Sequence, residues 1–281
     1  MNFHRDTAEI FVPDAMPPDQ ALRRTTHLAV AAHQDDIEIM AANPILECYQ
    51  RSDRWFTGVV VTDGRGSPRN GMYGRYSDEE MRVVRFKEQR KAAMIGEYAA
   101  QIMLDYPSKE VKGSSTLPVD DLATILKATR PQQVYTHNLA DKHDTHVSVA
   151  LKVIAALRSL PKDMRPQKLY GCEVWRGLDW MLDSDKVGFD LSGQENLQAA
   201  LLGVFDSQIS GGKRYDQASL ARRKANATYF ESHGLDITTG LSFGLDMTDL
   251  ILDDGKEPLA FIQEFIQRFV QDVTDRLQRV S

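Results

Sequence analysis

Four of the seven histidines in this chain lie in two short segments that also contain carboxylates. The first segment, 32–36, contains His33, Asp35 and Asp36. The second, 137–146, contains His137, Asp141, His143 and His146. Each segment directly follows an apolar run typical of a buried strand. Imidazoles and carboxylates bind divalent metals and transfer protons, so the two segments predict a shared metal-dependent site.

A division of roles follows from what a catalytic metal needs, which is three protein ligands and one open position. We expect His33 and Asp36 to supply two ligands and His146 to supply the third. Asp35 would then act as general base on a metal-bound water, whose pKa a metal lowers from about 15.7 to about 7. His143 would donate to the developing oxyanion. These residues together predict hydrolysis of an amide with the help of one divalent metal. We expect that metal to be Zn²⁺, with iron and nickel as alternatives.

Each feature has a simpler explanation when taken alone. A histidine after a strand is usually a polar loop residue, and an Asp-Asp pair is usually a helix cap or a turn. The coincidence of histidines at two strand ends favours the metal site over these explanations. His4 and His27 lack that context, and we expect them to be structural.

The elements that position these residues can be read from apolar runs and turn signals. Strands are expected at 26–32, 56–61, 101–105, 133–136 and 168–175. Helices are expected at 43–51, 77–97, 119–129, 144–160, 195–206, 214–232 and from Pro258 onward. The alternation predicts an α/β fold with a mostly parallel sheet and helices on both faces. In such sheets, ligands bind at the carboxyl ends of the strands, where both segments are expected.

We expect one domain over residues 1–281. Residues 1–24 contain three prolines and predict an irregular arm, and 33–43 predicts a loop. Residues 176–281 are expected to form a helical C-terminal elaboration. Its last helix has an apolar stripe, formed by Ile262, Ile266, Phe269, Val273 and Leu277.

The helix expected at 77–97 places Arg85 and Glu88 on its otherwise apolar face. Charges there are costly unless they are paired or bind a ligand. One interpretation is a buried Arg85–Glu88 pair that joins helix and sheet. The other is that Arg85 reaches into the crevice and binds substrate hydroxyls.

The composition excludes several classes of function. A net charge of −6 argues against a nucleic-acid partner. No segment approaches the ~18 apolar residues of a membrane span, and no apolar signal core is present at the N-terminus. Two isolated cysteines indicate a reducing compartment, so we expect a cytoplasmic enzyme without a membrane partner. The sequence is compatible with a homo-oligomer.

The motifs together resemble the LmbE/PIG-L-like family of zinc-dependent de-N-acetylases over roughly residues 26–150. The family's Ala-His-Pro-Asp-Asp-Glu motif is similar to 32–37 here, and its His-Pro-Asp-His motif to 143–146. The family's Arg-x-x-Glu-x-x-x-Ala-x-x-x-Gly helix pattern also occurs, from Arg85 to Gly96. The resemblance implies a Rossmann-like fold and hydrolysis of an N-acyl, usually N-acetyl, group on an amino sugar or sugar conjugate.

By the same resemblance His33, Asp36 and His146 would bind zinc, Asp35 would be the base and His143 the acid or oxyanion donor. Arg85 would contact the sugar. Gln34 replaces the motif proline, Ile37 the glutamate, and Thr145 the aspartate that normally polarises the catalytic histidine. Asp141 or Asp144 is expected to substitute for that aspartate.

Residues of the C-terminal third could complete the substrate site. His233 ends the expected helix 214–232 and could close over a substrate, or be a favourable charge at a helix C-terminus. Four residues near the end of the strand expected at 168–175 could line the substrate cleft, although core or surface roles are the simpler explanation for each: Glu173, Trp175, Arg176 and Asp179.

Three alternative functions remain open: an amidase for a non-sugar N-acyl metabolite, a degenerate member that binds metal or sugar without turnover, and a nucleotide-binding module. The last lacks a GxGxxG after the first strand, and a metalloprotease is disfavoured because HExxH is absent.

Overall fold

The computed structural model describes residues 1–231 and 233–281. Within them, an eight-stranded sheet has the order β1-β4-β3-β2-β5-β6-β8-β7. The strands are β1 (Glu9–Phe11), β2 (His27–Ala31), β3 (Phe56–Thr62), β4 (Ala100–Tyr106), β5 (Gln133–His137), β6 (Lys168–Cys172), β7 (Val187–Asp190) and β8 (Leu241–Asp246). The five strands from β4 to β6 in that order are parallel, while β1, β8 and β7 pair antiparallel at the two edges.

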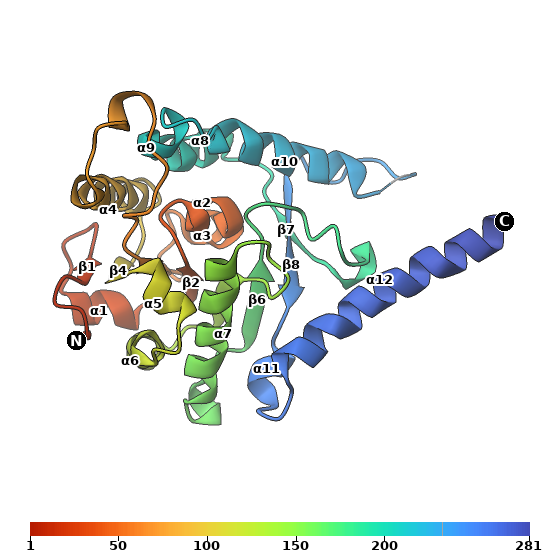
Figure 1. Cartoon of the computed structure of the whole chain (residues 1–281), viewed down its shortest axis with the longest axis horizontal. Coiled ribbons are helices and arrows are strands. Elements are labelled where there is room, and N and C mark those ends of the chain that lie inside the picture. Colours follow the sequence, from red (N-terminus) through yellow and green to blue (C-terminus); the bar gives the residue numbers. More distant parts are fainter. Residues whose placement is uncertain (232) are drawn as a thin grey trace.

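Two layers of helices cover the sheet (Figure 1). The helices are α1 (Pro18–Arg23), α2 (Asp36–Met40), α3 (Ala42–Cys48), α4 (Asp78–Ile95), α5 (Ser108–Lys112), α6 (Leu117–Thr129), α7 (Asp144–Arg158), α8 (Glu195–Gly203), α9 (Asp206–Ile209), α10 (Tyr215–Tyr229), α11 (Asp249–Leu252) and α12 (Pro258–Val280). Helices α1, α5, α6, α7 and α11 pack on one face. Helices α2, α3, α4 and α8 pack on the other.

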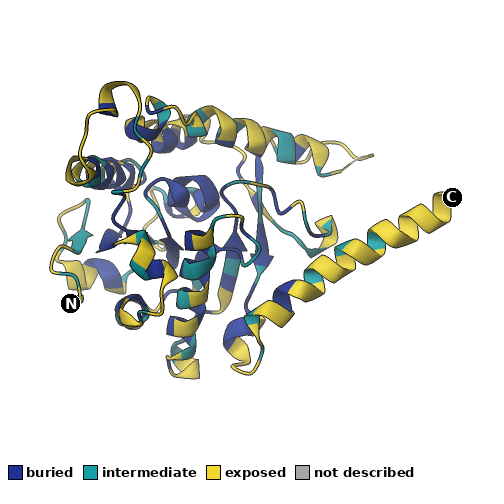
Figure 2. Cartoon of the chain, in the orientation of Figure 1, coloured by how far each residue is buried: buried dark blue, intermediate teal, exposed yellow. Residues whose placement is uncertain are grey.

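Strand β2 shows why the central strands are apolar throughout. Leu28 and Val30 point into one core cluster, whereas Ala29 and Ala31 point into the other. All four side chains are fully buried because successive side chains of a strand face opposite sides and both sides are covered. The predicted α/β architecture is therefore confirmed. In Figure 2 the central strands are coloured as buried, and so are helices α2 and α3.

The expected boundaries hold best where local signals are strong. Helix α4 begins after Ser77, whose side chain accepts a hydrogen bond from the N–H of Glu80 while the Glu80 carboxylate accepts one from the N–H of Ser77. This is the capping box expected from the sequence. After β2 the chain adds β3 and β4 on one side of that strand, and then adds β5 and β6 on its other side. In open α/β folds, ligands bind at such a switch in strand order, which here lies between β2 and β5.

Three expectations about organisation were wrong. The arm 1–24 contains α1 and also β1, which pairs with β4 through backbone hydrogen bonds that proline-rich composition does not reveal. The expected loop 33–43 contains α2, and α3 begins at Ala42, one residue before the expected start at 43. Asn43 lies inside α3, and its side-chain amide donates to the carbonyl of Asp190.

The C-terminal part is helical as expected, but it also adds β7 and β8 to the sheet. Strand β8 pairs with β6, which is far away in the sequence, so no local sequence pattern predicts this strand. Helix α10 ends at Tyr229, before the expected end at 232, and position 232 lies outside the described residues. None of the described helices has the length and apolar character that crossing a bilayer requires.

Candidate functional site

The two histidine-containing segments meet at the carboxyl edge of the sheet. Strands β2 and β5 are parallel neighbours, with Ala29 paired to Tyr135. The chain leaving β2 therefore reaches this edge beside the chain leaving β5, and α7 begins there at Asp144. Segments about a hundred residues apart in sequence thus form one site.

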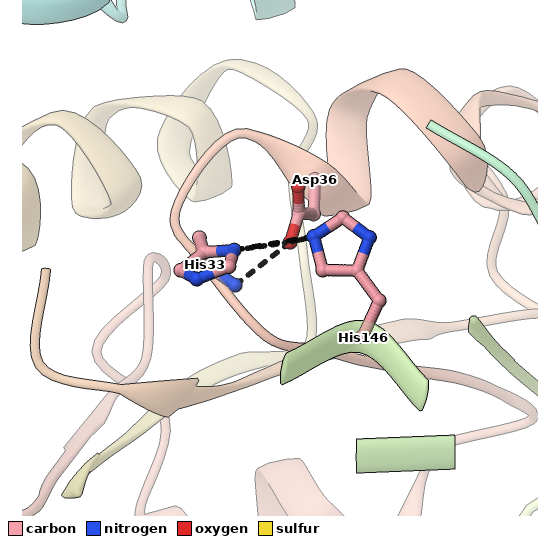
Figure 3. Close-up of side chains that lie close together, drawn as sticks. All are labelled: His33, Asp36 and His146. Carbon is pink, nitrogen blue, oxygen red and sulfur yellow. Dashed lines mark hydrogen bonds and ion pairs between the residues drawn. The ribbon is translucent and has the colours of Figure 1, made fainter. Parts of the chain in front are cut away.

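His33, Asp36 and His146 point toward one another in the manner of metal ligands (Figure 3). Nδ1 of His33 lies 3.2 Å from Oδ2 of Asp36 and 3.3 Å from Nε2 of His146. Nε2 of His146 lies 3.4 Å from the same carboxylate oxygen. Bonds of about 2.0–2.1 Å in a tetrahedral zinc site place ligand atoms about 3.3 Å apart. The three donor atoms therefore have the spacing that one small tetrahedral cation requires.

The charges of this group also suit a cation. Burial alone would raise the pKa of Asp36, but His146 and His33 beside it lower the pKa well below its usual range. Asp36 is thus held as a carboxylate. Asp36 and His146 are buried, while the His33 side chain is about a quarter exposed and faces the cleft.

Asp141 supports the ligand His146 from behind. Its Oδ2 lies 3.1 Å from Nδ1 of His146, and its Oδ1 accepts the N–H of His143 at 2.9 Å. A carboxylate on the far ring nitrogen orients a ligating histidine and leaves Nε2 for the metal. Although burial opposes it, the carboxylates of Asp36 and Asp141 raise the pKa of His146.

A second group, His137, Asp141 and His146, also has compatible spacing but is fully buried. Nε2 of His137 accepts the N–H of Ala32 at 2.8 Å, and its ring stacks on His146 with centroids 3.9 Å apart. Burial lowers the pKa of His137 well below its usual range, so the ring is neutral. His137 thus supports the loop and His146, and the cleft-facing group is the better candidate metal site.

Asp35 stands beside the three donors at the start of α2 and lines the cleft. Its backbone is left-handed, with a φ of 86°, a conformation that costs a non-glycine residue about 1–3 kcal/mol. Burial raises the pKa of Asp35 to about 7, with Arg85 opposing and Asp36 adding to the shift. A carboxyl group that titrates near neutral pH is suited to general base and acid work.

Arg85 forms the buried pair with Glu88 that was one of the two expectations, and it also borders the cleft. Nη1 lies 3.1 Å from Oε2 of Glu88, so the expected buried pair is formed. Nη2 lies 3.3 Å from Oδ2 of Asp35 and donates to the carbonyl of Gln34. Nη1 also donates to Oγ of Ser207 at 3.2 Å. Arg85 lines the cleft, but most of its donors are already engaged by protein groups.

His143 caps α7 at the rim of the cleft. Its Nδ1 accepts the N–H of Thr145, and its ring lies 5.0 Å from that of His33 between centroids. Burial lowers the pKa of His143, and the neighbouring His146 and His33 lower it further. Neither expected substitute for the missing aspartate reaches this ring: Asp141 bonds to the His143 backbone, and Asp144 is exposed.

A cleft of about 490 Å³ opens over these residues. The chain after β6 supplies several of its walls: Val174, Trp175, Gln208, Lys213 and Tyr215. Of the four residues expected to line the cleft near the end of the strand 168–175, Trp175 alone does so. The other wall residues lie on helices and loops with ordinary composition, so no sequence signal could have selected them.

The structure does not bring His233, the predicted substrate contact of the C-terminal third, to the cleft. It is exposed in the segment after α10 and is absent from the cleft lining. Helix α10 runs outward from the body, which carries its C-terminal end away from the sheet edge (Figure 1).

Comparison with known proteins gives a consistent result. Residues 28–157 match the family model PIG-L, described as GlcNAc-PI de-N-acetylase. The conserved protein TT1542 from Thermus thermophilus is 19% identical, with a TM-score of 0.60 over 79% of this chain and 94% of that one. The N,N'-diacetylchitobiose deacetylase from Pyrococcus horikoshii is 16% identical, with a TM-score of 0.59 over 78% and 83%.

The fold is not tied to one reaction. The 4-carboxy-2-hydroxymuconate hydratase GalB from Pseudomonas putida is 16% identical, with a TM-score of 0.56 over 78% of this chain and 95% of that one. No curated protein matches the sequence. The structural neighbours therefore establish the fold, and the reaction must be argued from the site.

Proposed function

We propose that the protein is a metal-dependent hydrolase that removes an N-acetyl group from an amino sugar, and the premise is the match of residues 28–157 to the PIG-L family model. The observation that carries the proposal is the 3.2–3.4 Å spacing of the His33, Asp36 and His146 donor atoms, with Asp35 beside them in an open cleft.

His33, Asp36 and His146 would hold one divalent cation, for which we propose Zn²⁺. When bound, such a cation lowers the pKa of water and polarises an acyl oxygen. The orientation of His146 by Asp141 and the ionised state of Asp36 suit the three residues to this task.

The remaining residues provide proton transfer and charge stabilisation. Asp35 would accept a proton from the attacking water and deliver it to the departing amine. His143 would donate from Nε2 to the oxygen of the acyl group as negative charge develops there. Arg85 would hold the Asp35 carboxylate in place.

The substrate class rests on the family and on the lining of the cleft. The family model names a de-N-acetylase of GlcNAc-PI, and the Pyrococcus relative is a deacetylase of N,N'-diacetylchitobiose. Trp175 and Tyr215 offer aromatic surfaces to a sugar ring, and Lys112 and Lys213 offer hydrogen-bond donors. A non-sugar N-acyl metabolite and metal binding without turnover are the alternatives.

Metal content and amine release together test this function. Elemental analysis should find about one equivalent of zinc or iron in the wild type, and much less in His33→Ala and His146→Ala. Amine release from N-acetylglucosamine and from N,N'-diacetylchitobiose should be abolished in Asp35→Asn, which should retain metal. Metal loss in Asp35→Asn would contradict its assigned role.

Two further results would decide between the alternatives. Wild-type protein that binds no metal even after reconstitution would refute the hydrolase proposal. Bound metal without release of amine from either sugar would favour a non-sugar substrate or the degenerate member. His233→Ala tests the predicted substrate contact, and unchanged kinetics would exclude it.

A further inference from the structure

The backbone of Asp35 has a conformation that its own sequence does not explain. Its φ of 86° lies in the left-handed region, which residues with a side chain adopt only at a cost in free energy. Its ψ is −28°, so Asp35 would have ordinary helical angles if its φ were negative. Contacts with other parts of the protein must therefore hold this residue, the proposed general base, in the costly conformation.

Rotation of a single peptide group would relieve this cost. Turning the plane of the peptide between Gln34 and Asp35 by about half a turn changes ψ of Gln34 and φ of Asp35, while the Cα atoms stay almost in place. Asp35 would then continue α2, which begins at Asp36, with a negative φ. The observed conformation thus requires a restraint on this one peptide group.

Two side chains of α4 bind this peptide group at its two ends. Nη2 of Arg85 donates to the carbonyl of Gln34. Oε1 of Gln89 accepts the N–H of Asp35 at 3.3 Å. The C=O and N–H of a trans peptide point in opposite directions, so contacts to both fix the orientation of its plane. We call this pair of contacts, from Arg85 and Gln89 to one peptide group, the peptide clamp.

The spacing of the two side chains explains how one helix supplies both contacts. Arg85 and Gln89 are four residues apart in α4, so they lie one above the other on the same face of the helix. Helices α4 and α2 pack on the same face of the sheet, which brings the two side chains to the start of α2 (Figure 1). Arginine has only donors for the carbonyl, whereas the amide of glutamine also has the acceptor that the N–H needs.

A buried network fixes the orientation of the Gln89 amide. Its Nε2 donates to Oε1 of Glu38 at 2.8 Å and to Oε1 of Gln101 at 3.2 Å. The hydroxyl of Tyr98 donates to the same oxygen of Glu38 at 2.8 Å. Because both acceptors lie on the nitrogen side of the Gln89 amide, its oxygen is directed to the N–H of Asp35.

The burial of this network argues for a role beyond packing. Gln89, Glu38 and Gln101 are fully buried among α4, α2 and β4. Aliphatic side chains would fill the same space without the cost of burying polar groups. The hydrogen bond from Asp35 to Gln89 joins the network to the proposed general base, which gives the buried amide a function.

We propose that Gln89 is a positioning residue, whose amide oxygen holds the N–H of Asp35 and so keeps the general base in its left-handed conformation. The inference rests on the proposed function, because Gln89 acts through Asp35. A rotated peptide would turn an N–H toward the donors of Arg85, so the two groups would repel. Arg85 would then leave the position from which it contacts the Asp35 carboxylate at 3.3 Å.

NMR tests the clamp without any turnover. In metal-free wild type, the Asp35 amide should be protected from hydrogen exchange, and its HN–Hα NOE should be strong, as it is only where φ is positive. Gln89→Met keeps the length of the side chain but removes its acceptor. It should speed exchange of this amide by about tenfold or more and weaken the NOE.

The matched control is Tyr98→Phe. Tyr98 is as buried as Gln89 and donates to the same network, but it does not contact Asp35. The exchange rate and the NOE of Asp35 should therefore stay at their wild-type values in Tyr98→Phe, even if its thermal stability falls. If Gln89→Met does not fold, Gln89→Asn replaces it with the same expectations, because its shorter amide does not reach the N–H.

Kinetics test the consequence for catalysis. Gln89→Met should lower kcat by about 10–100-fold through misplacement of the base, while KM and metal affinity stay unchanged. Tyr98→Phe should keep the wild-type kcat. The exchange variant Glu38→Gln/Gln89→Glu preserves one carboxylate, one amide and an acceptor for the Asp35 N–H, so it should recover most of the lost kcat.

The possible failures are distinguishable. Unchanged hydrogen exchange and NOE in Gln89→Met would refute the clamp. Faster exchange with unchanged kcat, or equal losses of kcat in Gln89→Met and Tyr98→Phe, would refute the positioning role. A wild type that releases amine from neither sugar would refute the proposed function, and the clamp would then stand or fall on the NMR measurements alone.

Discussion

The backbone N–H of Thr145 donates a hydrogen bond to Nδ1 of His143 over 3.3 Å. In the family motif that residues 143–146 resemble, an aspartate stands at this position and polarises the histidine. A backbone donor does the opposite, because Nδ1 must remain an acceptor and the single proton of the neutral ring must lie on Nε2. His143 is thus arranged as a neutral donor toward the cleft, rather than as an imidazolium acid.

Replacing His143 tests this arrangement. If the ring only donates a hydrogen bond to the acyl oxygen, the amide of His143→Gln should retain part of the activity. His143→Ala should lose about 10²–10³-fold in kcat, the usual cost of removing one oxyanion donor. Equal losses of kcat in the two variants would indicate a proton-transfer role instead.

Asp141→Asn should weaken metal binding. An amide cannot accept both the His146 ring proton and the His143 backbone N–H as the carboxylate does, so His146 should lose its orientation. Loss of such a supporting group typically costs about 10–100-fold in metal affinity, measurable by competition with a zinc chelator. Asp144→Asn, on the exposed neighbour, is the control and should leave metal affinity unchanged.

The role of Arg85 can be read from pH dependence. Its charge lowers the pKa of Asp35, so Arg85→Gln should raise that pKa. A smaller fraction of Asp35 would then be ionised at neutral pH. The acid limb of the pH profile of kcat/KM should therefore move to higher pH by about one unit. Arg85→Lys should largely restore it. A raised KM with an unmoved acid limb would favour the substrate contact predicted from the sequence.

Gly64, at the end of β3, is required by the close approach of two site residues. Its φ is 72°, and an added Cβ would lie 2.6 Å from Oε1 of Gln34 and 3.0 Å from Cβ of Arg85. Gly64→Ala should therefore lower unfolding free energy by about 1–3 kcal/mol and reduce activity. Gly66→Ala is the control, because a Cβ there meets nothing within 4 Å. Equal thermal stability of the two variants would contradict the prediction.

His27 should make the protein sensitive to acid. Burial, with a contribution from Arg54, lowers the pKa of His27 to about 4 from its ordinary 6.5. The unfolded chain therefore binds more protons between these values, and stability falls as pH drops from 6.5 toward 4. The part of this fall in unfolding free energy that is attributable to His27 is at most about 3 kcal/mol. His27→Leu should flatten thermal unfolding temperatures across this window; an unchanged slope would exclude His27 as the cause.

The sequence by itself determined the central architecture and pointed to the candidate metal-binding residues, because both depend on short-range patterns. Fully apolar runs identify strands covered on both faces, and the capping box at Ser77 locates the start of α4. The His33–Asp36 and His143–His146 segments follow strand ends, and the carboxyl ends of parallel strands share one edge. His33, Asp36 and His146 could therefore be assigned to one site before any distance was known.

Tertiary structure decided the features that depend on partners distant in sequence. Strand β8 exists because it pairs with β6, and β1 because it pairs with β4; neither pairing has a local signature. The support of His146 by Asp141, the neutral tautomer of His143 and the engagement of Arg85 by Ser207 depend on angstrom-scale placement across elements. His233 lies outside the cleft because the direction of α10, which is set by packing, carries it away.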